Sequence, residues 1–200
     1  PLLAALLTDA GAEVAGTAIT DDDPARFLAA FRACVDADVV VTSGGASAGA
    51  FDVVKEVTAP LGVQFVEVAM QPGKPQGFGR LPGPGGADVA VLALPGNPVS
   101  VFVSHHLFLR PLLAALQGTT AEPTVVLARA TTGWSCPPRR RQYTPVAVAF
   151  GDEVTCTPSH RLGSGSHLVA SLHRADGLAV AGEDAQAVEA GEIVPVILVR

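Results

Sequence analysis

The 200-residue chain has few cysteines, no recognisable leader and no obvious membrane segment. Its three cysteines, Cys34, Cys136 and Cys156, lie far apart without metal-ligand spacing. This odd, sparse set fits a reducing cytoplasm better than a disulfide framework. No basic-then-apolar leader opens the chain, and we expect no apolar run long enough to cross a bilayer. These absences predict a cytoplasmic protein that does not bind membranes.

Basic charge is also scarce. The formal net charge is −6 at pH 7, which argues against a nucleic-acid binder, because counterion release needs many clustered cations. The one basic run, residues 139–141, is expected to be a solvated loop. Only two lysines are present, Lys55 and Lys74, and each follows a glycine-containing loop where a compact ammonium could meet a phosphate.

What the chain does contain is typical of a globular protein, since 48% of its residues are hydrophobic and 16% are charged. Its length allows one large domain or two small ones. Because Pro1 already stands in a helix-like pattern, we expect the chain to be part of a longer protein.

Residues 1–118 alternate between helix-like and strand-like segments. Alternation of this kind predicts an α/β domain, with a mostly parallel sheet and helices on both of its faces. The expected helices cover 2–10, 24–35, 52–59 and 98–116, the last ending at Gly118. The expected strands cover 14–19, 39–41, 63–70, 76–81 and 89–94.

The sequence pattern changes after Gly118. Residues 119–200 show short runs of valine and alanine between turn signals, and no long helical period. We predict a small, mainly β domain, sandwich or barrel-like, after a linker near 118–123. Its expected strands cover 124–129, 142–150, 154–158, 178–180 and 193–199.

Residues 42–49 (TSGGASAG) form a loop rich in small residues where a strand-like run ends. Glycine permits positive φ and lets backbone N–H groups approach a ligand closely, so this loop can form a nest for phosphate. An ordinary strand-to-helix turn is the alternative, but the repeated serine and third glycine favour binding. The glycines are Gly44, Gly45 and Gly49, and the hydroxyl donors are Ser43 and Ser47.

Two further loops have similar character. In residues 71–75 (QPGKP), two prolines fix their φ angles and Gly73 allows a tight bend that presents Lys74. A surface turn with a solvated lysine is the alternative. In residues 94–100 (LPGNPVS), Asn97 can donate and accept hydrogen bonds, and a helix begins beside it. Three such loops predict a crevice for an anionic ligand at the carboxyl edge of a sheet.

Two acidic positions accompany these loops. Asp52 is either a helix-start acid that suits the helix dipole or a carboxylate beside bound phosphate, where it could hold Mg²⁺. Asp22 stands in an acidic run before Pro24 and, from the residues alone, reads as a helix cap. His105 and His106 have no partner for a metal site, and we expect at least one of them on the surface.

These motifs together resemble the MoeA family, which includes the gephyrin E domain and comprises molybdopterin molybdenumtransferases. The resemblance rests on 42–49, on Asp52 with Lys55, on 70–75 (MQPGKP) and on 94–100, in the family's order and spacing. Residues 1–118 resemble the molybdopterin-binding α/β domain, and 119–200 resemble the small C-terminal β domain. The family's other two domains would lie before Pro1.

The resemblance implies that adenylylated molybdopterin binds in the crevice, that molybdate displaces the adenylate with the help of Mg²⁺, and that AMP is released. It implies catalytic roles for Asp22, Asp52 and Lys74, with both aspartates as metal ligands, and it implies a homodimer. The substrate-binding residues it implies are Ser43, Gly44, Gly45, Ser47, Gly49, Gly73, Pro75, Pro95, Gly96, Asn97, Pro98, Ser100 and Ser166.

The chain departs from the family pattern at three positions. Some members carry lysine where this chain has Glu67 and Gln71, and a family arginine of the C-terminal domain is replaced here by Pro145. These departures bear on molybdate binding more than on pterin binding. They keep a second function open, a carrier or scaffold that only binds the pterin. A third is a nucleotide pyrophosphatase of the competence-damage type, because a related molybdopterin-binding-like domain occurs in competence-damage proteins.

Overall fold

The computed structural model describes residues 1–45, 52–160 and 169–199. It divides the chain into two compact units. The first comprises residues 1–68 and 73–97, and the second comprises residues 69–72 and 98–200. The chain therefore leaves the first unit briefly at 69–72, just before Gly73 and Lys74.

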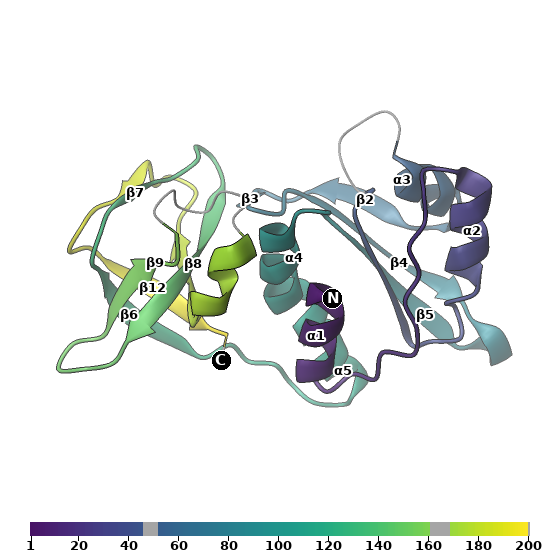
Figure 1. Cartoon of the computed structure of the whole chain (residues 1–200), viewed down its shortest axis with the longest axis horizontal. Coiled ribbons are helices and arrows are strands. Elements are labelled where there is room, and N and C mark those ends of the chain that lie inside the picture. Colours follow the sequence, from purple (N-terminus) through teal and green to yellow (C-terminus); the bar gives the residue numbers. More distant parts are fainter. Residues whose placement is uncertain (46–51, 161–168, 200) are drawn as a thin grey trace. The chain divides into compact units, whose positions relative to one another are not determined.

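The first unit is built on a four-stranded sheet in the order β1-β5-β4-β2 (Figure 1). β1 (Val39–Ser43) runs parallel to β5 (Asp88–Leu94), whereas β4 (Pro75–Pro82) is antiparallel to both β5 and β2 (Gln64–Glu67). The α/β class is thus confirmed for this unit. The prediction of a mostly parallel sheet is wrong, because β4 re-enters the sheet through a turn from its neighbour β2 and has to run antiparallel to it.

One face of this sheet is covered by α2 (Pro24–Arg32) and α3 (Val53–Thr58), as Figure 1 shows. Phe27 and Phe31 stand four residues apart on α2, so both reach the same core, and their rings stack with centroids 5.9 Å apart. In β5 the alternate residues Val89, Val91 and Ala93 face this cluster. A second helical layer on the opposite face stays a prediction.

The remaining elements of the first unit are short. α1 covers Leu2–Asp9 and buries no residue completely. Single 3₁₀ turns, η1 at Ala59–Leu61 and η2 at Pro84–Gly86, connect the larger elements.

The strand predicted over 14–19 does not form. Residues 12–20 lie outside any helix or strand, and Ile19 is fully exposed. A strand needs a partner for its backbone groups, and among the described residues β1 pairs only with β5. β1 is thus an edge strand, and the segment that resembled a strand lies unpaired. The predicted strand 63–70 is also interrupted: β2 ends at Glu67 and β3 covers Met70–Gln71.

The second unit contains a β-barrel. The order β10-β12-β6-β9-β8 is closed into a ring by an additional pairing between β10 and β8, and β3 adds in parallel to β8. The predicted mainly-β character is confirmed, and the barrel is the form that it takes. Its strands are β6 (Val125–Ala130), β8 (Arg141–Ala149), β9 (Thr155–Pro158), β10 (Gly177–Ala181) and β12 (Ile193–Leu198).

Small elements of this unit escaped prediction because they are too short to show a period. β7 (Trp134–Ser135) pairs with β11 (Ala187–Val188), and a 3₁₀ helix, η4, covers Val169–Arg174. The core of the barrel is formed by small and β-branched residues such as Ala128, Val146 and Val196, which are almost completely buried.

The long helix of the second unit is continuous but not uniform. α4 (Pro98–Ser104) passes through a π-helical turn, η3 (His105–Leu109), into α5 (Arg110–Leu116). It ends as predicted: Gly118 has φ +70°, its N–H donates to the Ala115 carbonyl, and Thr119 N–H donates to the Ala114 carbonyl. These two hydrogen bonds form a Schellman motif.

The run Pro98–Leu116 has the length and apolar composition of a membrane-crossing helix, and 56% of its apolar window is buried inside the protein. The expectation that no apolar run reaches this length is therefore wrong. A buried core helix has the same length and composition.

The expectation of a surface histidine on this helix is also wrong. The side chain of His105 is buried, and both ring nitrogens of His106 are buried without a hydrogen-bond partner among the described residues. Burial, followed by the nearby His105 and Arg110, lowers the pKa of His106 from its ordinary 6.5 to about 3. His106 is therefore neutral in the folded protein at neutral pH and packs edge-on against Phe102.

This depressed pKa predicts a loss of stability in acid. Below pH 6.5 the unfolded chain takes up a proton at His106 that the folded chain does not, so the free energy of unfolding falls as the pH decreases towards 3. The expected slope from this residue is at most about 1.4 kcal/mol per pH unit. Urea titrations of the wild type and His106→Leu between pH 7 and 4 measure it. Equal slopes in the two proteins would contradict the prediction, and His173→Leu, which alters an exposed histidine, is the control.

Candidate functional site

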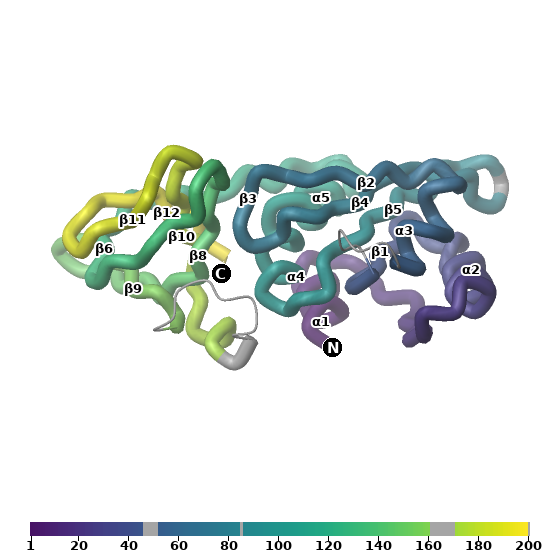
Figure 2. The backbone as a smooth tube through the Cα atoms, turned by 90° about the horizontal axis from the view of Figure 1, so that it is seen from above, coloured from purple at the N-terminus to yellow at the C-terminus, as the bar shows by residue number. Residues whose placement is uncertain are grey.

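Three of the predicted loops meet at one edge of the first unit's sheet. Ser43, the last residue of β1, pairs with Leu94, the last residue of β5, so the loops after these two strands leave the sheet together. β4 begins at Pro75, two residues before its Gly77 pairs with Ala93. The amino end of β4, with Lys74 just before it, therefore lies at the same edge as the carboxyl ends of β1 and β5, and Figure 2 shows β4 and β5 side by side.

The first two loops approach each other through their glycines. The Gly44 N–H donates to the Leu94 carbonyl at 3.1 Å. A Cβ on Gly96 would lie 2.9 Å from the Gly44 Cα, a distance at which backbone would have to move. Gly44 also has φ +91°, which favours glycine. The two backbones can therefore lie this close only because both positions lack a side chain.

Gly45 extends this contact towards Asp52. Its φ is +68°, and a Cβ there would collide with the Val54 side chain and lie 3.1 Å from Asp52 Oδ1. Asp52 is only 6% exposed and is the N-cap of α3, where its side chain accepts a hydrogen bond from the Lys55 N–H at 3.4 Å. The capping role is thus present in the structure, and it holds the carboxylate against the glycine loop.

Lys74 is engaged by a neighbour that sequence reasoning did not connect to it. Its Nζ lies 2.9 Å from Glu67 Oε2, with 40% of the lysine side chain and 61% of the glutamate side chain exposed. The Val68 N–H donates to the Lys74 carbonyl at 2.8 Å, which fixes the backbone beside this ion pair. The cation predicted to bind an anion therefore forms an exposed ion pair with a carboxylate in this structure.

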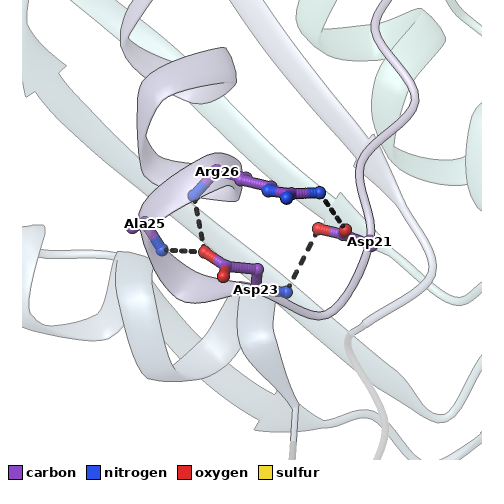
Figure 3. A network of polar contacts seen from close by, with 4 residues as sticks. All are labelled: Asp21, Asp23, Ala25 and Arg26. Carbon is purple, nitrogen blue, oxygen red and sulfur yellow. Dashed lines mark hydrogen bonds and ion pairs between the residues drawn. The ribbon is translucent and has the colours of Figure 1, made fainter.

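Asp22 does not take the capping role that the residues alone suggested. Asp23 is the cap of α2: its carboxylate accepts hydrogen bonds from the Ala25 and Arg26 N–H groups, both at 2.9 Å. Asp21 forms an ion pair with Arg26 and accepts from the Asp23 N–H (Figure 3). Asp21 and Asp23 thus stabilise the start of the helix, whereas Asp22 is exposed and its side chain is accessible.

Other predicted site residues fall elsewhere. Gly73 is buried in the first unit, and Gln76 Nε2 donates to its carbonyl at 2.7 Å. Pro95 is buried at the end of β5, and Asn97 is half-buried. Pro98 and the buried Ser100 lie in the first turn of α4, in the second unit. Ser47, Gly49 and Ser166 lie outside the described residues.

No preformed metal centre is present in the part of the chain that the structure describes: no group of three or more His, Cys, Asp or Glu side chains could hold an ion there. Mg²⁺ commonly keeps several waters and takes only one or two carboxylates together with substrate phosphates. Asp52 at the glycine loop is a donor of that kind, so the residues fit a Mg²⁺ ion that arrives with a phosphate ligand.

A second contact was also missed from the sequence. Arg140 Nη1 donates to Gln71 Oε1 at 2.9 Å, although the two residues stand 69 positions apart. The pairing of β3 with β8, which brings them together, involves only two residues of β3. No periodicity in so short a strand could have indicated the contact.

Taken together, the sheet edge of the first unit brings together the glycines of two loops, a buried carboxylate and a lysine. Such a set suits a phosphate-containing ligand bound through backbone and charge.

Comparison with known proteins agrees with this class of site. Residues 1–115 match the family model described as a probable molybdopterin binding domain, and residues 127–199 match the MoeA C-terminal region, domain IV. The fold and site thus define a molybdopterin-binding type of domain followed by a MoeA-type β-barrel. The chain belongs to the MoeA family.

Two relatives from Mycobacterium tuberculosis are named molybdopterin molybdenumtransferases. The chain is 49% identical over 125 residues to molybdopterin molybdenumtransferase 2 of Mycobacterium tuberculosis, covering 58% of this chain and 30% of that protein. It is 33% identical over 201 residues to molybdopterin molybdenumtransferase 1 of the same organism, covering 97% of this chain and 46% of that protein. The chain therefore spans less than half the length of these relatives.

A solved structure supports the fold. The molybdopterin biosynthesis MoeA protein from Pyrococcus horikosii superposes with a TM-score of 0.71 at 32% identity, over 90% of this chain and 42% of that one.

The contact between the two glycine loops predicts the effect of a single methyl group. Gly96→Ala places a Cβ against the Gly44 backbone, so we expect a loss of about 1–3 kcal/mol in the free energy of unfolding. Urea denaturation measures it. The matched control is Gly16→Ala, because a Cβ there meets nothing within 4 Å, and it should change stability by less than about 0.5 kcal/mol. A Gly96→Ala protein as stable as the control would show that the loops separate easily.

Proposed function

We propose that this chain is the pterin-binding part of a molybdopterin molybdenumtransferase, which inserts molybdate into adenylylated molybdopterin and releases AMP. The observation that carries the proposal is the meeting of the Gly44–Gly45 loop, Gly96 and Asp52 at one sheet edge. The family membership of both units supports it.

In this proposal the chain's residues act by positioning and electrostatics. The glycine loop, which lets the substrate approach the backbone closely, and the side chains of Ser43 and Asn97 bind and orient the phosphate-containing substrate. Lys74 stabilises negative charge once ligand competes with Glu67 for its ammonium. Asp52, with the accessible Asp22, holds Mg²⁺ beside the phosphate, and the metal, when bound, screens the repulsion between carboxylate and phosphate.

The proposal also covers the location and the oligomeric state of the protein. We propose a cytoplasmic protein, which the three free cysteines support, and a homodimer with no nucleic-acid partner. The competing function is a carrier or scaffold that binds the pterin without turnover, and the observation that favours it is the ion pair of Lys74 with Glu67.

Molybdate-dependent release of AMP tests the function directly. The longer protein that contains this chain is given adenylylated molybdopterin, with and without molybdate, and AMP is quantified. Release that requires molybdate is the expected result. Binding of the pterin without such release would support the carrier, and hydrolysis of unrelated nucleotides would support a pyrophosphatase.

Asp52 offers a test that separates chemistry from capping. Asparagine caps helices about as well as aspartate, so Asp52→Asn should keep the free energy of unfolding within about 1 kcal/mol of the wild type and yet abolish AMP release. Asp52→Ala should lose about 1 kcal/mol in addition.

The matched control for this test is Asp23→Asn, which alters the cap of α2 in the same way. It should retain AMP release. A fully active Asp52→Asn protein would assign Asp52 to capping alone.

A further inference from the structure

Lys74 lies at the edge of the first unit's sheet where the glycine loops leave it, and a glutamate stands beside this lysine. The Lys74 Nζ lies 2.9 Å from Glu67 Oε2. Both side chains reach solvent, with 40% of the lysine and 61% of the glutamate exposed. The two opposite charges add to zero, so the pair as a whole gives an incoming anion little net attraction.

The hairpin of β2 and β4 holds the pair in place. Glu67 ends β2 and pairs with the first residue of β4. The Val68 N–H donates to the Lys74 carbonyl at 2.8 Å, and the buried Gln76 donates from Nε2 to the Gly73 carbonyl at 2.7 Å. The hairpin therefore keeps the Glu67 carboxylate near any anion that binds at the ammonium.

An anion at Lys74 experiences two separate effects of Glu67. An exposed ion pair contributes little to stability, so an anion can take the place of the carboxylate on the ammonium. This competition weakens the binding of every anion by the same factor. The displaced carboxylate stays close and also repels the anion, and this repulsion grows with the charge of the anion. The repulsion therefore distinguishes one class of phosphate from another.

Phosphates differ in charge according to the number of their ester links. A terminal phosphate carries about 1.5–2 negative charges at pH 7, whereas a phosphate that is linked on both sides carries one. A lysine alone attracts the terminal phosphate more strongly. With a carboxylate beside the lysine, the additional attraction and the additional repulsion oppose each other, and the preference for the terminal phosphate is lost.

We propose that Glu67 is a specificity-determining residue, which cancels the preference of Lys74 for terminal phosphates and so favours phosphates that are linked on both sides. The proposal rests on the function proposed above and deepens it. The phosphates of adenylylated molybdopterin are linked on both sides, whereas the released AMP carries a terminal phosphate. Glu67 thus weakens the binding of this product relative to the binding of the substrate.

Two small esters test the proposal: methyl phosphate, which is a terminal phosphate, and dimethyl phosphate, which is linked on both sides. Phosphorus NMR titrations at about pH 8 and constant ionic strength give their Kd values for the longer protein that contains this chain. Glu67→Gln should lower both Kd values, and that of methyl phosphate about threefold more, as one additional charge about 6 Å from the carboxylate predicts in water. An equal change for the two esters would overturn the role of Glu67.

The matched control is Asp88→Asn. Asp88 begins β5 and forms an exposed ion pair with Arg80, whose Nη1 lies 3.9 Å from Asp88 Oδ2. The seven residues of β5 separate it from the site edge, a length of about 20 Å against a Debye length of about 10 Å at 0.1 M salt. The ratio of the two Kd values should stay within about 1.5-fold of the wild type. A change as large as that of Glu67→Gln would show an effect of net charge and overturn the proposal.

Lys74→Met establishes whether the esters bind at this pair. Loss of a charge-assisted hydrogen bond should raise both Kd values about tenfold. Unchanged Kd values in Lys74→Met would overturn the proposal, and so would the absence of binding of both esters by the wild type and by Glu67→Gln.

The outcomes separate this proposal from the proposed function, because AMP release is measured independently of the two Kd values. Molybdate-dependent AMP release with an unchanged Kd ratio in Glu67→Gln overturns the role of Glu67 and keeps the transferase. A changed Kd ratio without AMP release overturns the transferase and leaves an ion pair that selects among phosphates.

Discussion

The candidate site depends on a close approach of two backbones, those of Gly44 and Gly96. β1 and β5 are parallel and end at the same pair of residues, so their loops must leave the sheet side by side. Two side chains could not share that space, because a single Cβ on Gly96 would already press against the opposite backbone. The neighbouring Gly45 continues the glycine loop towards Asp52 at the start of α3.

The sequence was a good guide where structure is local. α2 begins where an aspartate run meets Pro24, the long helix ends at Gly118, and the valine-rich β5 and the barrel strands lie within one or two residues of their predicted ranges. It was a poor guide to strand direction, because the chain turns back from β2 into β4, and β4 therefore runs antiparallel to its neighbours β2 and β5. The segment 14–19 had the pattern of a strand and lacked a partner.

The same distinction holds for the site. Glycine at positions 44, 45 and 96 predicted loops whose backbone lies close to a ligand or to another segment. The structure shows that the loops of Gly44 and Gly96 lie close to one another. The ion pair of Lys74 with Glu67 depends on strand register, and the contact of Arg140 with Gln71 depends on a two-residue strand. Neither leaves a periodic signal in the chain. The loops could therefore be predicted from sequence, and the distribution of charge around them could not.

The unpaired edge of β1 has a consequence for handling the protein. Its outer backbone groups have no ladder partner among the described residues, and fully exposed Ile19 belongs to the same unit. An open strand edge is a template for another strand. At high concentration, two molecules of this chain would be expected to join through that edge, and solubility would then depend on whether a further polypeptide strand covers it.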